Sequence, residues 1–128
     1  MLVPITALYA GLLGLIGFGL AAGSGFQRSK TGVSIGDGNH PDQIVAVRRH
    51  GNFTEWVPLD LILLAILELN EVSATALHVL GGWLVVARIC HPIGIRSATE
   101  SNPLRTVGAL STALITVICS VWAITTAF

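Results

Sequence analysis

VRRHGNFTEWVPL, residues 47–59, is the most informative segment of the sequence, because it carries charged side chains into a stretch that is otherwise apolar. On a helix, its polar side chains and one leucine would form a single stripe made of Arg48, Asn52, Glu55 and Leu59. A charged side chain costs at least about 2.5 kcal/mol inside a bilayer, so such groups are retained where they face one another, another helix or a ligand. The stripe therefore indicates either a structural ion pair, Glu55 with Arg48 or with an arginine of another helix, or a binding site.

The composition around this stretch favours a membrane protein. Of the 128 residues, 52% are hydrophobic and only 11% are charged, and the mean hydropathy is +0.75. A soluble domain of this size would carry about 25% charged residues. The formal net charge is zero, which gives no basic face for nucleic acid, so nucleic acid is not expected as a partner.

Apolar stretches long enough to cross a bilayer divide the chain into four helices. A spanning helix needs about 20 mostly apolar residues. We predict one integral membrane domain over residues 1–128, an all-α bundle with transmembrane helices at about 2–26, 43–69, 72–94 and 103–127. The second and third are interrupted by Asp60 and His78. Asp60 lies off the polar stripe, and we expect it to make a packing contact, with His78 as its candidate partner.

The basic residues fix the expected orientation. They flank the first and third connections, whereas the second connection carries Glu68 and Glu71 and no cation; the basic residues are Arg28, Lys30, Arg48, Arg49, Arg88, Arg96 and Arg105. Cytoplasmic loops are enriched in lysine and arginine. Both basic connections, including a polar loop at about 27–42, are therefore predicted to face the cytoplasm, in a multi-pass protein typical of a bacterial inner membrane.

Three motifs resemble one known family. The pattern Arg48-x-x-x-Asn52-x-x-Glu55-x-x-Pro58 resembles the second-helix signature of the MAPEG family, membrane-associated proteins in eicosanoid and glutathione metabolism. The run ARICH, residues 87–91, resembles the end of the third helix in microsomal glutathione transferases, and NPLR, residues 102–105, matches the start of the fourth. The resemblance covers essentially the whole chain and implies a homotrimer with glutathione between subunits, near the cytoplasmic face.

The resemblance also implies the site residues. Arg48, Asn52 and Glu55 would hold the glutathione backbone, whose two carboxylates and one ammonium call for cations and an anion in one pocket. Arg28 is a weaker candidate for a carboxylate, and the matching run adds Arg88 and His91 to the binding set. Arg105 corresponds to the arginine that faces the sulfur, where a fixed cation favours the nucleophilic thiolate. The other interpretation of Arg105 is an anchor at the lipid interface.

Two positions depart from the family pattern, and they keep a second function open. Members with thiol chemistry carry a tyrosine where Ile95 stands, and several carry one at His91. The leading hypothesis is a glutathione transferase or peroxidase acting on lipophilic electrophiles or lipid hydroperoxides. The alternative is a non-enzymatic membrane protein of the same fold that binds lipid or glutathione. A small multidrug exporter is disfavoured because residues 2–26 contain no carboxylate, and no metal-ligand spacing is present.

Overall fold

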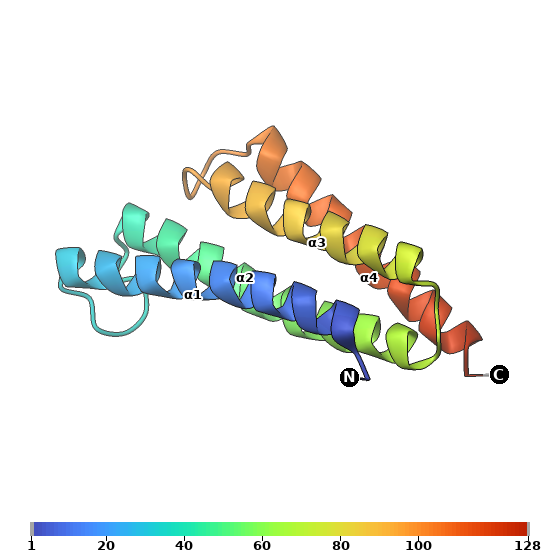
Figure 1. Ribbon diagram of the computed structural model, residues 1–128. Helices are drawn as coiled ribbons and strands as arrows, with labels where there is room; N and C mark the ends of the chain where they lie inside the picture. The colour runs from blue at the N-terminus through green and yellow to red at the C-terminus, as the bar shows by residue number, and fades with distance from the viewer. Residues whose placement is uncertain (1, 128) are drawn as a thin grey trace.

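Four helices form an up-and-down bundle in the computed structural model, which describes residues 2–127. Figure 1 shows them in the order α1 (Pro4–Thr31), α2 (Pro41–Leu69), α3 (Ala74–Gly94) and α4 (Pro103–Thr125). The most extensive packing is between α1 and α2 and between α3 and α4. Residues 2–127 contain no strand. The predicted all-α bundle is therefore confirmed.

The helix ends follow from short sequence signals. Proline opens α1, α2 and α4, in the first turn, where its missing N–H costs no hydrogen bond. Asn102 caps α4 by accepting a hydrogen bond from the backbone N–H of Leu104 at 2.9 Å, and Ser73 caps α3. Pro92 does not end α3, which continues to Gly94.

The prediction for the end of the first helix was wrong. It was expected to end near residue 26, with a loop over 27–42, but α1 continues to Thr31 and ends on Gly32, which adopts the left-handed conformation at φ 70°. Arg28 and Lys30 lie in the last turn of α1, where cations are favourable near the carbonyl end of a helix. The loop is correspondingly shorter, and Arg28 donates to three of its carbonyl groups.

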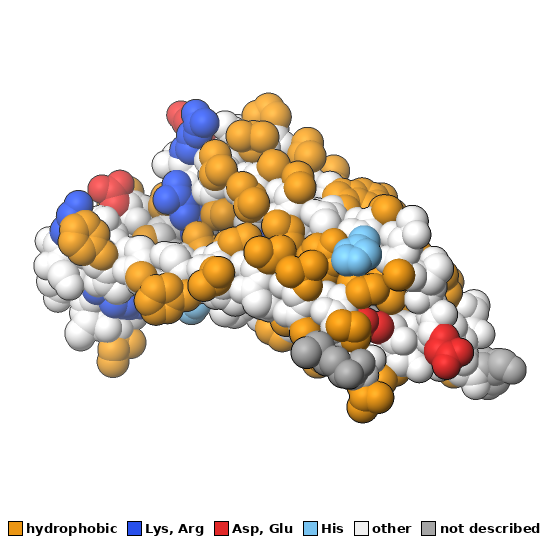
Figure 2. Space-filling model, in the orientation of Figure 1, with side chains coloured by type: hydrophobic (Ala, Val, Ile, Leu, Met, Phe, Trp, Pro, Cys, Tyr) orange, Lys and Arg blue, Asp and Glu red, His pale blue; other side chains and the backbone are white. Residues whose placement is uncertain are grey.

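The chain is an integral membrane protein, and its basic end lies at the membrane surface. Three helices, α1, α3 and α4, are long and apolar enough to cross a bilayer, whereas polar side chains lower the mean hydropathy of α2. From Glu68 back to Arg48 the rise along α2 is about 30 Å, the thickness of the hydrocarbon core. In Figure 2 the lysine and arginine side chains lie at one end of this face of the molecule.

Polar contacts hold α1 against α2 and α3 at the end of the bundle opposite the basic residues. The Glu68 carboxylate accepts hydrogen bonds from the backbone N–H groups of Ile5 and Thr6, at 2.8 and 2.7 Å, and so caps the start of α1. The Tyr9 hydroxyl lies 3.0 Å from Nδ1 of His78 and 2.9 Å from the His78 carbonyl oxygen. These bonds fix α1 against the end of α2 and the start of α3.

The predicted contact between Asp60 and His78 is therefore wrong. His78 faces Tyr9 of α1, while Asp60 faces α4 and accepts a hydrogen bond from the Thr116 hydroxyl at 2.6 Å. The two residues interrupt neighbouring apolar segments in the sequence, but they lie on different sides of the bundle. Sequence spacing shows on which face of its own helix a residue lies, but it does not show which neighbouring helix that face contacts.

Candidate functional site

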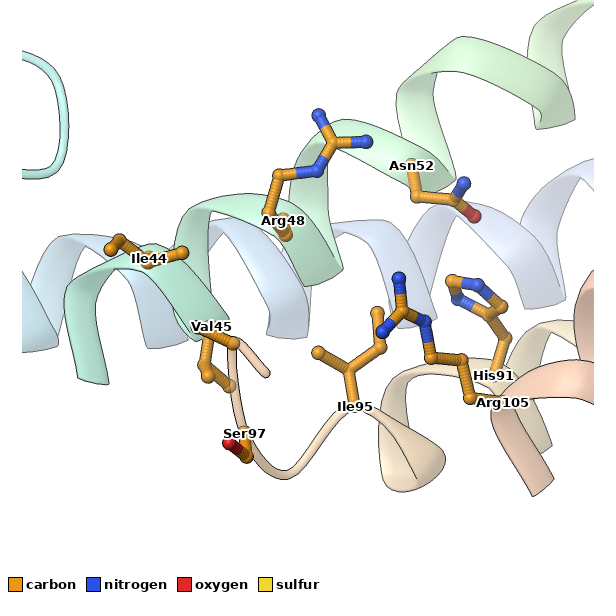
Figure 3. A pocket seen from close by; sticks show the side chains of 9 residues that line it. Ile44, Val45, Arg48, Asn52, His91, Ile95, Ser97 and Arg105 are labelled. Carbon is orange, nitrogen blue, oxygen red and sulfur yellow. The ribbon is translucent and has the colours of Figure 1, made fainter. Parts of the chain in front are cut away.

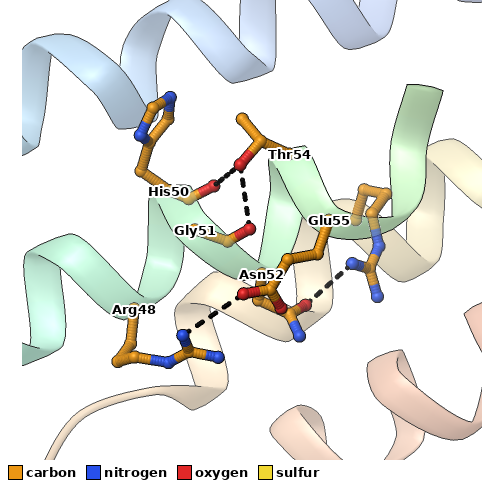
Figure 4. Close-up of polar contacts among 7 residues, drawn as sticks. Arg48, His50, Gly51, Asn52, Thr54 and Glu55 are labelled. Carbon is orange, nitrogen blue, oxygen red and sulfur yellow. Dashed lines mark hydrogen bonds and ion pairs between the residues drawn. The ribbon is translucent and has the colours of Figure 1, made fainter.

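A buried arginine links three helices beneath the basic end. Arg88 of α3 is 1% exposed, and its Nη1 donates to Oδ1 of Asn52 in α2 at 3.0 Å. Its Nη2 donates to the carbonyl oxygen of Gly108 in α4 at 3.1 Å. Because the Asn52 oxygen accepts from Arg88, the Asn52 NH₂ group remains available as a donor, and Figure 4 draws no contact from it.

Two glycines let α4 approach α3 closely at this level. A Cβ added to Gly108 would lie 2.8 Å from the carbonyl oxygen of Ala87 and 2.8 Å from His91, inside normal contact distance. A Cβ added to Gly94 would collide with the backbone of Arg105. The start of α4, and with it Arg105, is therefore placed directly against the end of α3.

The polar stripe of α2 contains an ion pair, as one of the two sequence interpretations expected. Nη1 of Arg48 lies 3.3 Å from Oε1 of Glu55 (Figure 4). The two side chains are still 55% and 51% exposed in the single chain. The pair leaves much of both charged groups accessible to another molecule.

A cleft opens where α2, the end of α3 and the start of α4 meet. Figure 3 shows Arg105 and His91 side by side, pointing toward Arg48 and Asn52 on α2. Ile95 adds an apolar wall, and the cleft has a volume of about 80 Å³. The cleft therefore combines cations, an amide and an imidazole with an apolar wall.

Arg105 is the cation of the cleft that no other group neutralises. It is exposed, and among residues 2–127 it has no hydrogen bond or ion pair with a side chain. Arg48, in contrast, is paired with Glu55, and Arg88 is bound to oxygen atoms on two helices. The field of Arg105 is therefore available to an anion that enters the cleft.

The structure brings most of the predicted site residues together, with one exception. Four of them line the cleft: Arg48, Asn52, His91 and Arg105. Glu55 lies next to the cleft, paired with Arg48, and Arg88 donates a hydrogen bond to Asn52. Arg28 lies outside the cleft of its own chain, because its guanidinium donates to the carbonyl oxygens of Val33, Ser34 and Gly36 in the first loop.

Sequence reasoning missed the part played by Arg49. Its Nε and Nη2 donate to the carbonyl oxygen of Ile95 at 3.0 and 2.6 Å and tie α2 to the residue that ends α3. The last carbonyl groups of a helix need partners outside it, and arginine side chains often supply them. The available signal was that Arg49 stands next to the polar stripe at the same membrane depth, but nothing in the sequence identified its acceptor.

Comparison with known proteins agrees with the motifs in this cleft. A family model described as "MAPEG family" matches residues 6–125 of the chain. Two curated relatives, both named inner membrane protein YecN, come from Escherichia coli strain K12 and Escherichia coli O6:H1. Each is 30% identical over 90 residues, which cover 70% of this chain and 69% of the relative. No solved structure matches the chain.

Proposed function

The chain belongs to the MAPEG family, and from this we propose that it is a membrane-bound glutathione transferase with peroxidase-like capacity, which activates the glutathione thiol against lipophilic electrophiles or lipid hydroperoxides. The observation that carries the proposal is the unpaired Arg105 in a cleft shared with Arg48, Asn52 and His91. Such a cleft offers an anionic thiol both binding groups and a fixed positive field.

The donors and acceptors present suit glutathione. Its two carboxylates are matched by Arg48 and by the NH₂ group of Asn52, whose oxygen is held by Arg88. Its ammonium is matched by Glu55, which exchanges part of its pairing with Arg48 for the ligand. Buried charges need such partners inside a membrane protein, and the ligand supplies them.

A neighbouring subunit completes the site in this proposal. Pockets for ligands of this size usually enclose about 300–1,000 Å³, whereas the cleft of one chain has about 80 Å³. Arg48 and Glu55 are half exposed at a depth where lipid would otherwise contact them. We propose a homotrimer in which the next chain covers these side chains. Arg28 would bind a carboxylate only across such a boundary, since it lies outside its own cleft.

The chemistry proposed is nucleophilic substitution by the thiolate. Arg105 stabilises the negative sulfur, so the thiol loses its proton to water without a general base. The sulfur then forms a bond to the electrophilic carbon, and the leaving group departs with its electron pair. With a hydroperoxide, the sulfur attacks the terminal oxygen, the O–O bond breaks, and the leaving alkoxide takes a proton to become an alcohol. The thiol of a second glutathione then displaces water from the sulfenic acid and forms the disulfide. The lipophilic substrate reaches the cleft from the bilayer.

Replacing Glu55 by glutamine tests the binding part of the proposal. Losing the carboxylate that faces the ammonium is expected to weaken glutathione binding about tenfold, the effect of one hydrogen bond to a charged group. Calorimetric titration of the purified protein in detergent measures this. Glu71→Gln, at the opposite end of the bundle, is the matched control. Equal affinity of the two variants would remove Glu55 from the site, and no binding by the wild type would remove the proposed function.

The second candidate is a non-enzymatic protein of this fold that binds lipid or glutathione. The observation in its favour is Ile95, which lines the cleft with an apolar side chain where thiol-active relatives present a tyrosine hydroxyl. Conjugation of a generic aryl halide separates the two functions. Turnover supports the transferase, and saturable glutathione binding without turnover supports the binding protein.

A further inference from the structure

A second and larger cleft lies on the other side of Arg49. It is bordered by the later part of α1, the first turns of α2 and the residues after α3, and it has a volume of about 360 Å³. Gly19 and Gly23 of α1 face open space in this cleft, since a Cβ added at either position would meet nothing within 4 Å. In Figure 2 cationic side chains border the hollow between the two helix pairs at this end. Val45 lines both this cleft and the Arg105 cleft.

Two arginines and one carboxylate line this cleft without neutralising one another. Arg49 uses Nε and one N–H of Nη2 on the Ile95 carbonyl, and its remaining N–H groups are free to donate. Arg96 is exposed and has no hydrogen bond or ion pair among the side chains of residues 2–127. Asp42 lies in the same cleft and forms no ion pair with either arginine. The cleft thus presents separated positive and negative groups.

The depth of these groups matches the headgroup region of a bilayer. Arg49 lies about 30 Å along α2 from Glu68, so it sits at the border between hydrocarbon and phosphate. Asp42 lies two turns farther out, in the first turn of α2. A neighbouring depression shares Leu20, Arg49 and Arg96 with this cleft and adds the apolar side chains of Pro92 and Ile93. Apolar, cationic and anionic groups therefore lie next to one another at this end of the bundle.

We propose that this cleft binds one membrane glycerophospholipid with an ethanolamine headgroup. Arg49 and Arg96 would bind the phosphate, Asp42 the ammonium, and Leu20, Pro92 and Ile93 an acyl chain. Guanidinium groups pair well with phosphate oxygens, and the ammonium accounts for a carboxylate that a purely anionic lipid would not need. The site adjoins the Arg105 cleft at Val45 but shares none of its charged residues, and it does not depend on the proposed enzymatic function.

Native mass spectrometry of the detergent-solubilised protein tests the proposal with three probes: phosphatidylethanolamine, phosphatidylglycerol, and inorganic phosphate with diacylglycerol. The wild type is expected to retain phosphatidylethanolamine most tightly. Arg96→Ala should weaken binding of both phospholipids about fivefold, the effect of one interfacial arginine. Asp42→Asn should remove the preference for ethanolamine. Lys30→Ala, which removes a cation at the same end but outside the cleft, is the control and should behave as the wild type.

Four results would overturn the proposal. A wild type that binds phosphatidylglycerol as tightly as phosphatidylethanolamine would remove the ethanolamine assignment. Equal losses for Arg96→Ala and Lys30→Ala would show attraction to the basic end in general. Inorganic phosphate that bound alone as tightly as the lipid would identify a soluble ligand. A change in oligomeric mass that followed the cleft substitutions in the absence of lipid would show that a second copy of the chain covers the cleft.

Discussion

Replacement of Arg105 by alanine is expected to lower kcat for conjugation of an aryl halide by about 100- to 1,000-fold. Removing one fixed donor or cation that faces an anion usually has this effect in a site closed to water, and in the proposed homotrimer the neighbouring subunit closes the cleft. Glutathione affinity should fall much less, because Arg48, Asn52 and Glu55 bind the other end of the molecule. Steady-state kinetics with saturating glutathione measure the change.

Two further variants separate a catalytic cation from an interfacial anchor. Arg105→Lys keeps a positive charge beside the sulfur and should recover a large part of the activity that Arg105→Ala loses. Lys30→Ala removes an exposed cation that lies over the Phe26 ring, outside both clefts, and should leave kcat unchanged. If Arg105→Ala and Lys30→Ala gave the same kcat, Arg105 would be an anchor and the transferase proposal would lose its catalytic group.

Replacement of Arg88 by methionine is expected to have the largest effect on stability, a loss of about 3 kcal/mol in the free energy of unfolding. The substitution removes the hydrogen bonds by which Arg88 joins α3 to Asn52 of α2 and to Gly108 of α4. Leaving a buried acceptor without its donor costs about 1–3 kcal/mol. Thermal unfolding in detergent measures the loss.

Controls for Arg88 come from the same chain. Lys30→Met replaces a cation by methionine at an exposed position outside both clefts and should shift stability by less than about 0.5 kcal/mol. The double variant Arg88→Met with Asn52→Leu should recover part of the loss, because replacing both partners of the hydrogen bond leaves neither polar group unpaired. If Arg88→Met and Lys30→Met unfolded at the same temperature, Arg88 would not hold the three helices together.

The parts of the fold that short-range signals determine could be predicted from the sequence. Apolar length and the grouping of basic residues predicted four alternating helices, and spacing within α2 gave the Arg48–Glu55 pair as one of the alternatives left open. The end of α1 was misplaced because polar residues after Phe26 suggested a loop, whereas cations at a helix terminus near the membrane surface favour continuing the helix.

Contacts between helices could not be predicted, because they depend on register and rotation. The bond from Arg88 to Asn52, the bond from Arg49 to Ile95, and the partner of Asp60 all join helices whose relative positions the sequence does not state. Arg105 reaches the cleft only because Gly94 and Gly108 let α4 lie against α3. The motif resemblance supplied the residues of the site, and the packing supplied their distances and their pairing.

The ultraviolet absorbance of the thiolate, followed as glutathione is added to the purified wild type at neutral pH, shows whether the cleft holds glutathione in its thiolate form. If Arg105 supplies an unneutralised positive field, saturating glutathione will produce thiolate absorbance that an S-methylated glutathione cannot produce. Glutathione that binds with its thiol still protonated, or that does not bind, would contradict the account.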